Sequence, residues 1–179
     1  MRHSFVPVAL LLAVGCAGGS AGPAAAPTAT PALVTRLIGT TGTPVGTATL
    51  SETRDGVSVR FELKGLAPGT HGAHVHAVGK CEPPGFTTAA GHLNTTGKQH
   101  GHKNPAGWHL GDVGNVVAKT DGTVDATLVV RGATLAPGPM SLLGPNGTTA
   151  LVVHANPDDE MTDPAGNAGP RIACGVLTR

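Results

Sequence analysis

Apolar and polar residues alternate with a period of two over most of the chain from Leu33 onward, a pattern typical of half-buried β-strands. The apolar runs are short and are bounded by Gly, Pro and Asp, which favour turns. Asp55-Gly56 and Asp121-Gly122 are hairpin dipeptides between neighbouring runs. No segment keeps a 3.6-residue period over three turns, so long helices are not expected. The predicted strands are residues 34–38, 46–51, 57–63, 72–78, 113–118, 123–130, 150–154 and 171–177.

Two long segments, at about residues 79–112 and 156–170, show neither period. Loops of this length inside a compact domain usually carry function. Eight short strands with many turns therefore predict an all-β fold, an eight-stranded antiparallel Greek-key β-sandwich or barrel with two long functional loops.

The amino-acid composition limits which residues can form the core and which partners are expected. Aromatic residues make up 2% of the chain, so a core must be built mainly from Val, Leu, Ile and Ala. The net charge is +1, and no basic helix or aromatic–basic interleaving is present, which argues against a nucleic-acid partner.

The N-terminal segment predicts export. Residues 1–16 combine a short polar start with an apolar run too short to span a bilayer, which indicates a signal peptide. The run ends in Leu12-Ala13-Val14-Gly15-Cys16, which resembles the bacterial lipoprotein box and makes Cys16 a lipidation candidate; secretion without lipid is the alternative. Residues 17–32 are rich in Ala, Gly, Pro and Thr and predict a flexible tether before a domain at 33–179. We expect a cell-envelope or periplasmic protein anchored to the membrane through Cys16.

The chain contains three cysteines, an odd number for a secreted protein. If Cys16 is lipidated, Cys81 and Cys174 remain as one pair that an exported compartment would allow to oxidise. Closing a loop of this length should stabilise the fold by about 4–5 kcal/mol in the chain-entropy model.

The histidines are concentrated in the first long loop and in the strand before it. Seven of the nine lie between His71 and Asp112. Imidazole is the commonest side-chain ligand for zinc and copper. His74 and His76 stand two apart on a predicted strand, so they share a face; a solvated face is the alternative interpretation. Three histidines with a carboxylate suit zinc and four nitrogens suit copper, so the residues present predict two ions that share one histidine. The remaining candidates are His92, His100, His109, Asp112 and, after an apolar run, His154.

At these residues the chain from about 34 to 178 resembles a copper/zinc superoxide dismutase. The resemblance rests on motifs along the chain and on the spacing from His92 to His100 and His109. The motifs are Gly72-Ala73-His74-Val75-His76, Gly91-His92, His109-Leu110-Gly111-Asp112-Val113-Gly114-Asn115, Leu151-Val152-Val153-His154 and Gly166-Asn167-Ala168-Gly169-Pro170-Arg171-Ile172-Ala173-Cys174-Gly175.

The resemblance implies two metal cofactors and a redox reaction. Copper would be held by His74, His76, His92 and His154, and zinc by His92, His100, His109 and Asp112. Cycling between Cu(II) and Cu(I) would convert superoxide to oxygen and hydrogen peroxide, with zinc in a structural role and His92 carrying a proton.

The resemblance also assigns residues around the metals. Arg171 would hold the superoxide anion, and a Cys81–Cys174 disulfide would tie the first long loop, residues 79–112, to the last strand. We call this first loop the metal loop. Asp158 would join His74 to His100, and His71 would be a hydrogen-bonding histidine outside the ligand set; a solvated loop aspartate is the alternative for Asp158. We expect His102 to be a surface side chain.

The second loop departs from many family members because it carries four acidic residues and no lysine. Attraction of superoxide would then come from Lys80, Lys98 or Lys103 in the metal loop. Bacterial members use varied dimer surfaces, so the resemblance admits a homodimer without specifying one.

Two functions compete at this stage. The first is a superoxide dismutase of the cell envelope. The alternative is a non-enzymatic copper/zinc-binding envelope protein on the same fold, which would need neither a shared histidine nor Arg171; a zinc-only structural lipoprotein would leave His74, His76 and His154 unexplained.

Overall fold

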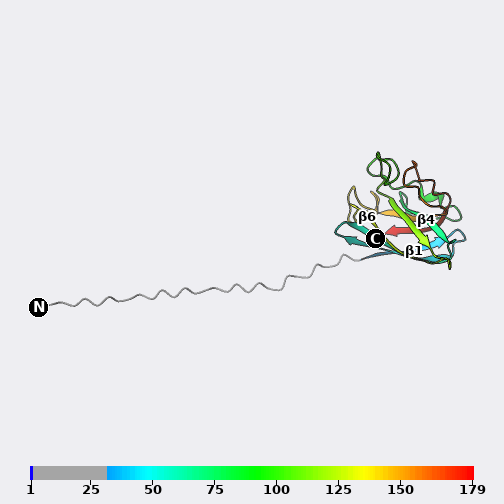
Figure 1. Cartoon of the computed structure of the whole chain (residues 1–179), viewed down its shortest axis with the longest axis horizontal. Coiled ribbons are helices and arrows are strands. Elements are labelled where there is room, and N and C mark those ends of the chain that lie inside the picture. Colours follow the sequence, from blue (N-terminus) through cyan, green and yellow to red (C-terminus); the bar gives the residue numbers. More distant parts are fainter. Residues whose placement is uncertain (2–31) are drawn as a thin grey trace.

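The computed structural model describes residues 32–179, together with Met1, and these residues form strands joined by loops (Figure 1). The predicted signal peptide, the tether and Cys16 lie outside the described residues. None of the described residues forms a helix long and apolar enough to cross a membrane. The elements are β1 (Leu33–Gly39), β2 (Pro44–Thr53), β3 (Gly56–Leu63), β4 (Gly69–His76), the 3₁₀ helix η1 (Thr87–Ala89), β5 (Asp112–Ala118), β6 (Val124–Arg131), β7 (Thr148–His154) and β8 (Arg171–Thr178).

The eight strands form one antiparallel sheet in the order β5-β4-β7-β8-β1-β2-β3-β6. The two end strands, β5 and β6, also contact each other, so the sheet curls into a nearly closed barrel. The chain crosses from β3 to β4 and from β6 to β7, which places β4 beside β7, as in Greek-key folds. The predicted all-β, eight-stranded antiparallel fold is confirmed.

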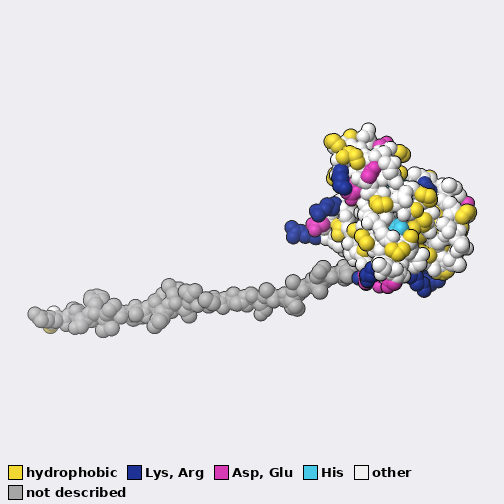
Figure 2. Space-filling model, turned by 45° about the vertical axis from the view of Figure 1, so that its right-hand side comes forward, with side chains coloured by type: hydrophobic (Ala, Val, Ile, Leu, Met, Phe, Trp, Pro, Cys, Tyr) yellow, Lys and Arg dark blue, Asp and Glu magenta, His cyan; other side chains and the backbone are white. Residues whose placement is uncertain are grey.

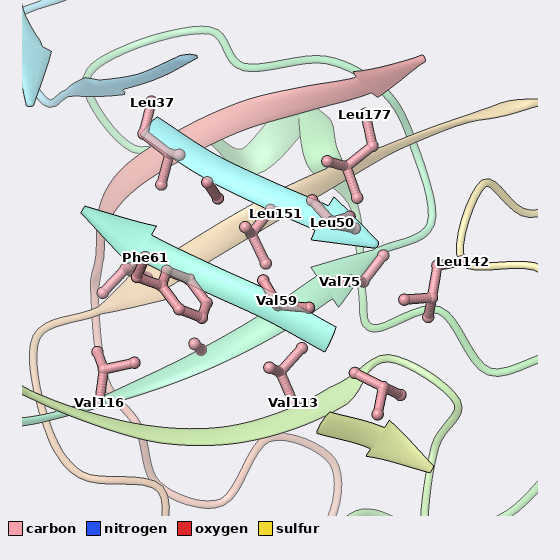
Figure 3. Close-up of a cluster of buried hydrophobic side chains, with 14 of the residues drawn as sticks. Leu37, Leu50, Val59, Phe61, Val75, Val113, Val116, Leu142, Leu151 and Leu177 are labelled. Atoms are coloured by element: carbon pink, nitrogen blue, oxygen red, sulfur yellow. The ribbon is translucent and has the colours of Figure 1, made fainter. Parts of the chain in front are cut away.

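The barrel interior is filled by aliphatic side chains from both halves of the sheet, with Phe61 as the one large ring among them (Figure 3). Leu37, Leu50, Val59 and Leu151 are fully buried, as expected for alternating strands whose inner face is apolar. Isoleucine contributes less than the composition suggested, because Ile38 and Ile172 are only partly buried at the edges of the core.

The predicted strands all form, with ends that differ from the prediction by at most three residues. The largest shift is at β4, predicted at 72–78 and observed at Gly69–His76. Backbone hydrogen bonds from Ala77 N–H to Gly91 O and from Val78 N–H to Ala89 O turn the chain into the metal loop directly after His76. A third long connection, residues 132–147, lies between the predicted strands 123–130 and 150–154; its Thr134 and Leu135 are held by the carboxylate of Glu52.

The two predicted long loops lie together on one side of the barrel (Figure 1). The backbone N–H of Lys103 donates to Glu160 O, and the side-chain amide of Asn104 donates to Met161 O. The Cys81–Cys174 disulfide is present and joins the metal loop to β8, which confirms that prediction. The loops are therefore fastened to each other and to the barrel wall.

Candidate metal centre

Strand β4 carries the first histidines of the site and is buried on both faces. Val75 packs in the barrel core, whereas His74 and His76 are covered by the loops outside. The backbone of Val75 accepts from Leu93 N–H and donates to Gly111 O, both at 2.8 Å, so the metal loop lies directly against the strand. A Cβ on Gly111 would collide with the Val75 carbonyl, which is why a glycine is needed there.

Four imidazoles converge in a first donor group that consists of His74, His76, His92 and His154. One nitrogen from each lies within 4.8 Å of the others. His74 Nδ1 and His92 Nε2 are buried and have no hydrogen-bond partner. A buried polar atom without a partner is energetically costly, so two such nitrogens in one group fit the role of metal ligands.

Backbone carbonyls set the orientation of two further rings in this group. His76 Nδ1–H donates to Ala90 O at 2.8 Å, and His154 Nδ1–H donates to Gly169 O at 3.0 Å. A carbonyl can only accept, so each ring carries its proton on Nδ1 and has its lone pair on Nε2. The two Nε2 atoms lie 3.4 Å apart, which gives the group nitrogen lone pairs that a cation of the copper type can accept.

A second donor group surrounds the carboxylate of Asp112. Its Oδ1 lies 3.0 Å from Nδ1 of His92 and of His100 and 3.4 Å from Nδ1 of His109. Its Oδ2 accepts from the backbone N–H of Gly101 and of His109, which holds the carboxylate in place. Three imidazole nitrogens around one carboxylate oxygen make the donor set of a closed zinc site.

His92 takes part in both groups through its two ring nitrogens. Its Nδ1 faces Asp112, and its Nε2 is the partnerless atom in the first group. The carboxylate-centred set that lies within mutual reach contains His74 with His92, His100 and Asp112, whereas the sequence suggested His109 as the fourth ligand. His109 Nδ1 is nevertheless 3.4 Å from both His92 Nδ1 and Asp112 Oδ1.

Burial keeps the first group in the neutral form that binds cations. Burial lowers the pKa of His76 to about 2, of His74 to about 3 and of His154 to about 4. Burial also lowers the pKa of His100, but hydrogen bonds to Asp112 and Asp158 outweigh it and raise the pKa to about 9. Burial would raise the pKa of Asp112, yet its histidine neighbours hold it well below its usual range. A cation at Asp112 would displace the proton from His100 Nδ1.

Asp158, from the second long loop, hydrogen-bonds to one histidine of each donor group. Its Oδ2 accepts from His74 Nε2–H at 2.8 Å, and its Oδ1 accepts from His100 Nε2–H at 2.9 Å. The carboxylate is buried, and both of its contacts direct the opposite ring nitrogen, Nδ1, towards a donor group. The solvated-loop interpretation of Asp158 is therefore wrong.

Arg171 lies at the open side of the first group. Its guanidinium donates to Phe86 O at 2.6 Å and to Ala90 O at 2.5 Å, so the metal loop fixes its position. Together with His76, His92 and His154 it lines a pocket of about 500 Å³, which Lys98 and Asp163 also border. A fixed cation beside His92, whose Nε2 has no hydrogen-bond partner, makes this pocket suitable for a small anion.

The remaining histidines stay outside both groups. His71 is buried and its ring nitrogens lie 2.8 Å from the carbonyl oxygens of His154 and Ala67, so it supports the backbone of a first-group residue. His102 is exposed, donates to the Asp112 carbonyl oxygen and lies 5.2 Å from the Trp108 ring. Figure 2 shows only a small patch of histidine on its face of the molecule, in keeping with the burial of the others.

Three supporting residues had not been singled out as site residues. The side-chain amide of Asn115 donates to Asp158 O and its carbonyl oxygen accepts from Asp158 N–H. Asp163 accepts from the backbone N–H of His100 at 2.6 Å. Gly166 has a φ of +61°, and a Cβ there would collide with the Asp158 carboxylate. Asn115 and Gly166 lie in the motifs that carry the family resemblance, but contacts across loops are not visible in a sequence.

The sequence is similar to a known protein family and to individual bacterial proteins. Residues 44–177 match the model of the family described as copper/zinc superoxide dismutase. The chain is 46% identical over 142 residues to "Superoxide dismutase [Cu-Zn] 2" of Aquifex aeolicus, covering 79% of this chain and 83% of that protein. It is 42% identical to "Superoxide dismutase [Cu-Zn]" of Caulobacter vibrioides, covering 76% and 79%.

Solved structures share the fold. A SOD-like protein from Bacillus subtilis superposes with a TM-score of 0.76 at 33% identity, covering 80% of this chain and 97% of that one. The Cu/Zn superoxide dismutase from Brucella abortus superposes with a TM-score of 0.64 at 29% identity, covering 82% and 99%.

Replacement of Asp158 tests whether the two donor groups depend on one carboxylate. Asp158→Asn keeps the size of the side chain but cannot accept from both His74 and His100 in the same way, so both rings lose orientation. We expect affinity for added zinc or copper to fall by about 10- to 100-fold, measured by competition with a chelator. Asp125→Asn, an exposed aspartate on β6, is the matched control. Unchanged affinity in Asp158→Asn would show that the rings are oriented without it.

Proposed function

The chain belongs to the copper/zinc superoxide dismutase family, and we propose that its two donor groups hold the copper and the zinc with which it disproportionates superoxide to oxygen and hydrogen peroxide. The observation that carries the assignment is the double role of His92, whose Nδ1 faces Asp112 while its Nε2 is a buried, partnerless atom of the first group. One imidazole between two donor sets is what a shared ligand requires.

The proposed ligand atoms follow from the hydrogen bonds that the rings already make. A nitrogen whose proton is directed to a carbonyl or carboxylate is not available to a metal, so the opposite nitrogen is the ligand. The copper ligands are His74 Nδ1, His76 Nε2, His92 Nε2 and His154 Nε2. The zinc ligands are His92 Nδ1, His100 Nδ1, His109 Nδ1 and Asp112 Oδ1.

When bound, copper supplies the one-electron exchange with superoxide, and zinc supplies a fixed charge without redox chemistry. The protein residues control anion binding and proton position. Arg171, held by Phe86 O and Ala90 O, presents its charge to an anion in the pocket. His92 also lines this pocket, and its Nε2, when not bound to copper, would be the atom that holds a proton for peroxide. A protein that only stored metal would need neither Arg171 nor a proton-holding His92 beside this pocket.

Replacement of Arg171 tests the anion role separately from metal binding. Because Arg171 donates to backbone carbonyls and is not a proposed ligand, Arg171→Ala should retain both metals. We expect kcat/KM for superoxide to fall on the order of a hundredfold, measured by pulse radiolysis on samples with matched metal content. Arg36→Ala on β1 is the control and should retain the rate. A fully metallated Arg171→Ala with the parent rate would contradict the assignment.

Lys98 is the proposed source of long-range attraction for superoxide. Of the three lysines considered, Lys98 borders the pocket, whereas Lys103 is paired with Glu160 at 2.7 Å and Lys80 is outside the pocket lining. A cation at the mouth raises the encounter rate of an anion, and salt weakens that effect.

We therefore expect Lys98→Gln to lower kcat/KM several-fold at low salt and to flatten its dependence on ionic strength. Lys119→Gln, in the turn between β5 and β6, serves as the control for a general change in net charge. An identical salt dependence in Lys98→Gln and the parent protein would assign the attraction to other charges.

We propose that the mature protein is held at the cell envelope by a lipid on Cys16. The support is the sequence alone, with an apolar run ending in Leu-Ala-Val-Gly-Cys and an Ala/Gly/Pro/Thr stretch before the barrel. Mass spectrometry of the mature protein should find Cys16 as a lipidated N-terminus, and Cys16→Ser should move the protein from the membrane to the soluble fraction. A mature N-terminus at another residue would reject the anchor.

A further inference from the structure

A second pocket lies beside the metal centre and is not explained by the dismutase reaction. It has a volume of about 290 Å³, and its lining includes Thr96, Lys98, Trp108, Leu110, Arg131 and Met140. We call it the Trp108 pocket. Leu110 is fully buried and Met140 is half-buried, so the floor is apolar, whereas Trp108 remains 44% exposed. An exposed indole next to an apolar floor leaves a flat hydrophobic surface open to a ligand.

Two cations border this apolar floor without a compensating charge. Neither Lys98 nor Arg131 forms an ion pair with a carboxylate among residues 32–179. Arg60 and Lys103, by contrast, both have acidic partners. Arg131 ends β6 and Lys98 belongs to the metal loop, so two separate elements bring these cations to one pocket. The pair favours an anionic group.

The shape and the remaining side chains favour an aromatic body for this anion. The volume is near the lower end of small-molecule sites, which suits a single ring. Trp108 can stack on such a ring, and the Met140 thioether makes favourable contacts with ring edges. Stacking on Trp108 and the charge of the two cations together favour a ligand with a flat apolar ring that carries a carboxylate.

We propose that the Trp108 pocket binds a small aromatic carboxylate, with the ring between Trp108 and the apolar floor and the carboxylate at Arg131 and Lys98. Superoxide itself has no part in this site, because the Trp108 pocket lacks His76, His92, His154 and Arg171. The proposal stands independently of catalysis.

The chain provides its own reporter, because Trp108 is its only tryptophan. Benzoate, titrated into the metallated protein, should change the intrinsic fluorescence in a saturable manner. Cyclohexanecarboxylate carries the charge without the flat ring and should bind more weakly. Benzyl alcohol carries the ring without the charge and should give no saturable change. No saturable signal with benzoate, or equal signals with benzyl alcohol, would overturn the proposal.

Replacement of Arg131 tests whether benzoate binds in the Trp108 pocket. Arg131 lines the Trp108 pocket and not the metal pocket, whereas Lys98 borders both, so Arg131→Gln is the clean substitution. It should weaken benzoate binding about tenfold or more while superoxide consumption and metal content stay unchanged. Arg36→Gln should bind benzoate like the parent protein. Equal affinity in Arg131→Gln and Arg36→Gln would place the ligand elsewhere.

A second copy of the chain is the competing occupant. If two copies cover Trp108, its fluorescence will depend on protein concentration in the absence of benzoate, and sedimentation will show a dimer that Trp108→Ala dissociates. That result would overturn the small-ligand proposal and assign the pocket to an interface between copies.

Discussion

Imidazole nitrogens and carboxylate oxygens with free lone pairs are buried together at one place in this fold, and this burial governs how the loops are arranged. Six histidines and one aspartate sit beneath the loops, and their ring nitrogens and carboxylate oxygens face each other instead of water. Without a ligand this arrangement is unfavourable, because burial removes hydration and leaves His74 Nδ1 and His92 Nε2 without partners. Two bound cations would reverse the balance, because the imidazoles, once His100 has released its extra proton, and the ionised carboxylate would become their ligands. The free energy of metal binding is thereby coupled to the order of loops that contain little apolar surface of their own.

The barrel makes this burial possible by using both faces of one strand. In β4, Val75 belongs to the core while His74 and His76 face outward into the site. The metal loop then bonds to the backbone of Val75 through Leu93 and Gly111, and the Cys81–Cys174 disulfide ties the loop to β8. Rigid aliphatic packing on one side therefore sets the positions of the ligands on the other. Arg171 depends on the same arrangement, because its two carbonyl partners belong to the metal loop.

The second loop orients the site without contributing a proposed ligand. Asp158 links His74 to His100, Asn115 holds the backbone of Asp158, and Gly166 leaves room for the carboxylate. The loop is acidic, and its Asp163 borders the metal pocket together with the cations Lys98 and Arg171. Lys98 borders both the metal pocket and the Trp108 pocket, so the same charge is available to a substrate anion on one side and to a bound carboxylate on the other.

The strands, the cysteine pair and the residue types of the site follow from the order of amino acids alone. Period-two alternation located all eight strands because each has one face in an aliphatic core, and the spacing of His74, His76, His92, His100 and His109 pointed to two metals because the chemistry of imidazole is local. Tertiary structure decided which nitrogen of each ring is free, since that depends on carbonyls of Ala90 and Gly169 and on Asp158, all distant in sequence. It also decided that Lys98 and Arg131 share a pocket with Trp108, and that Glu52 holds the connection at residues 132–147. Contacts of this kind arise where the loops fold across the barrel, so no local pattern along the chain encodes them.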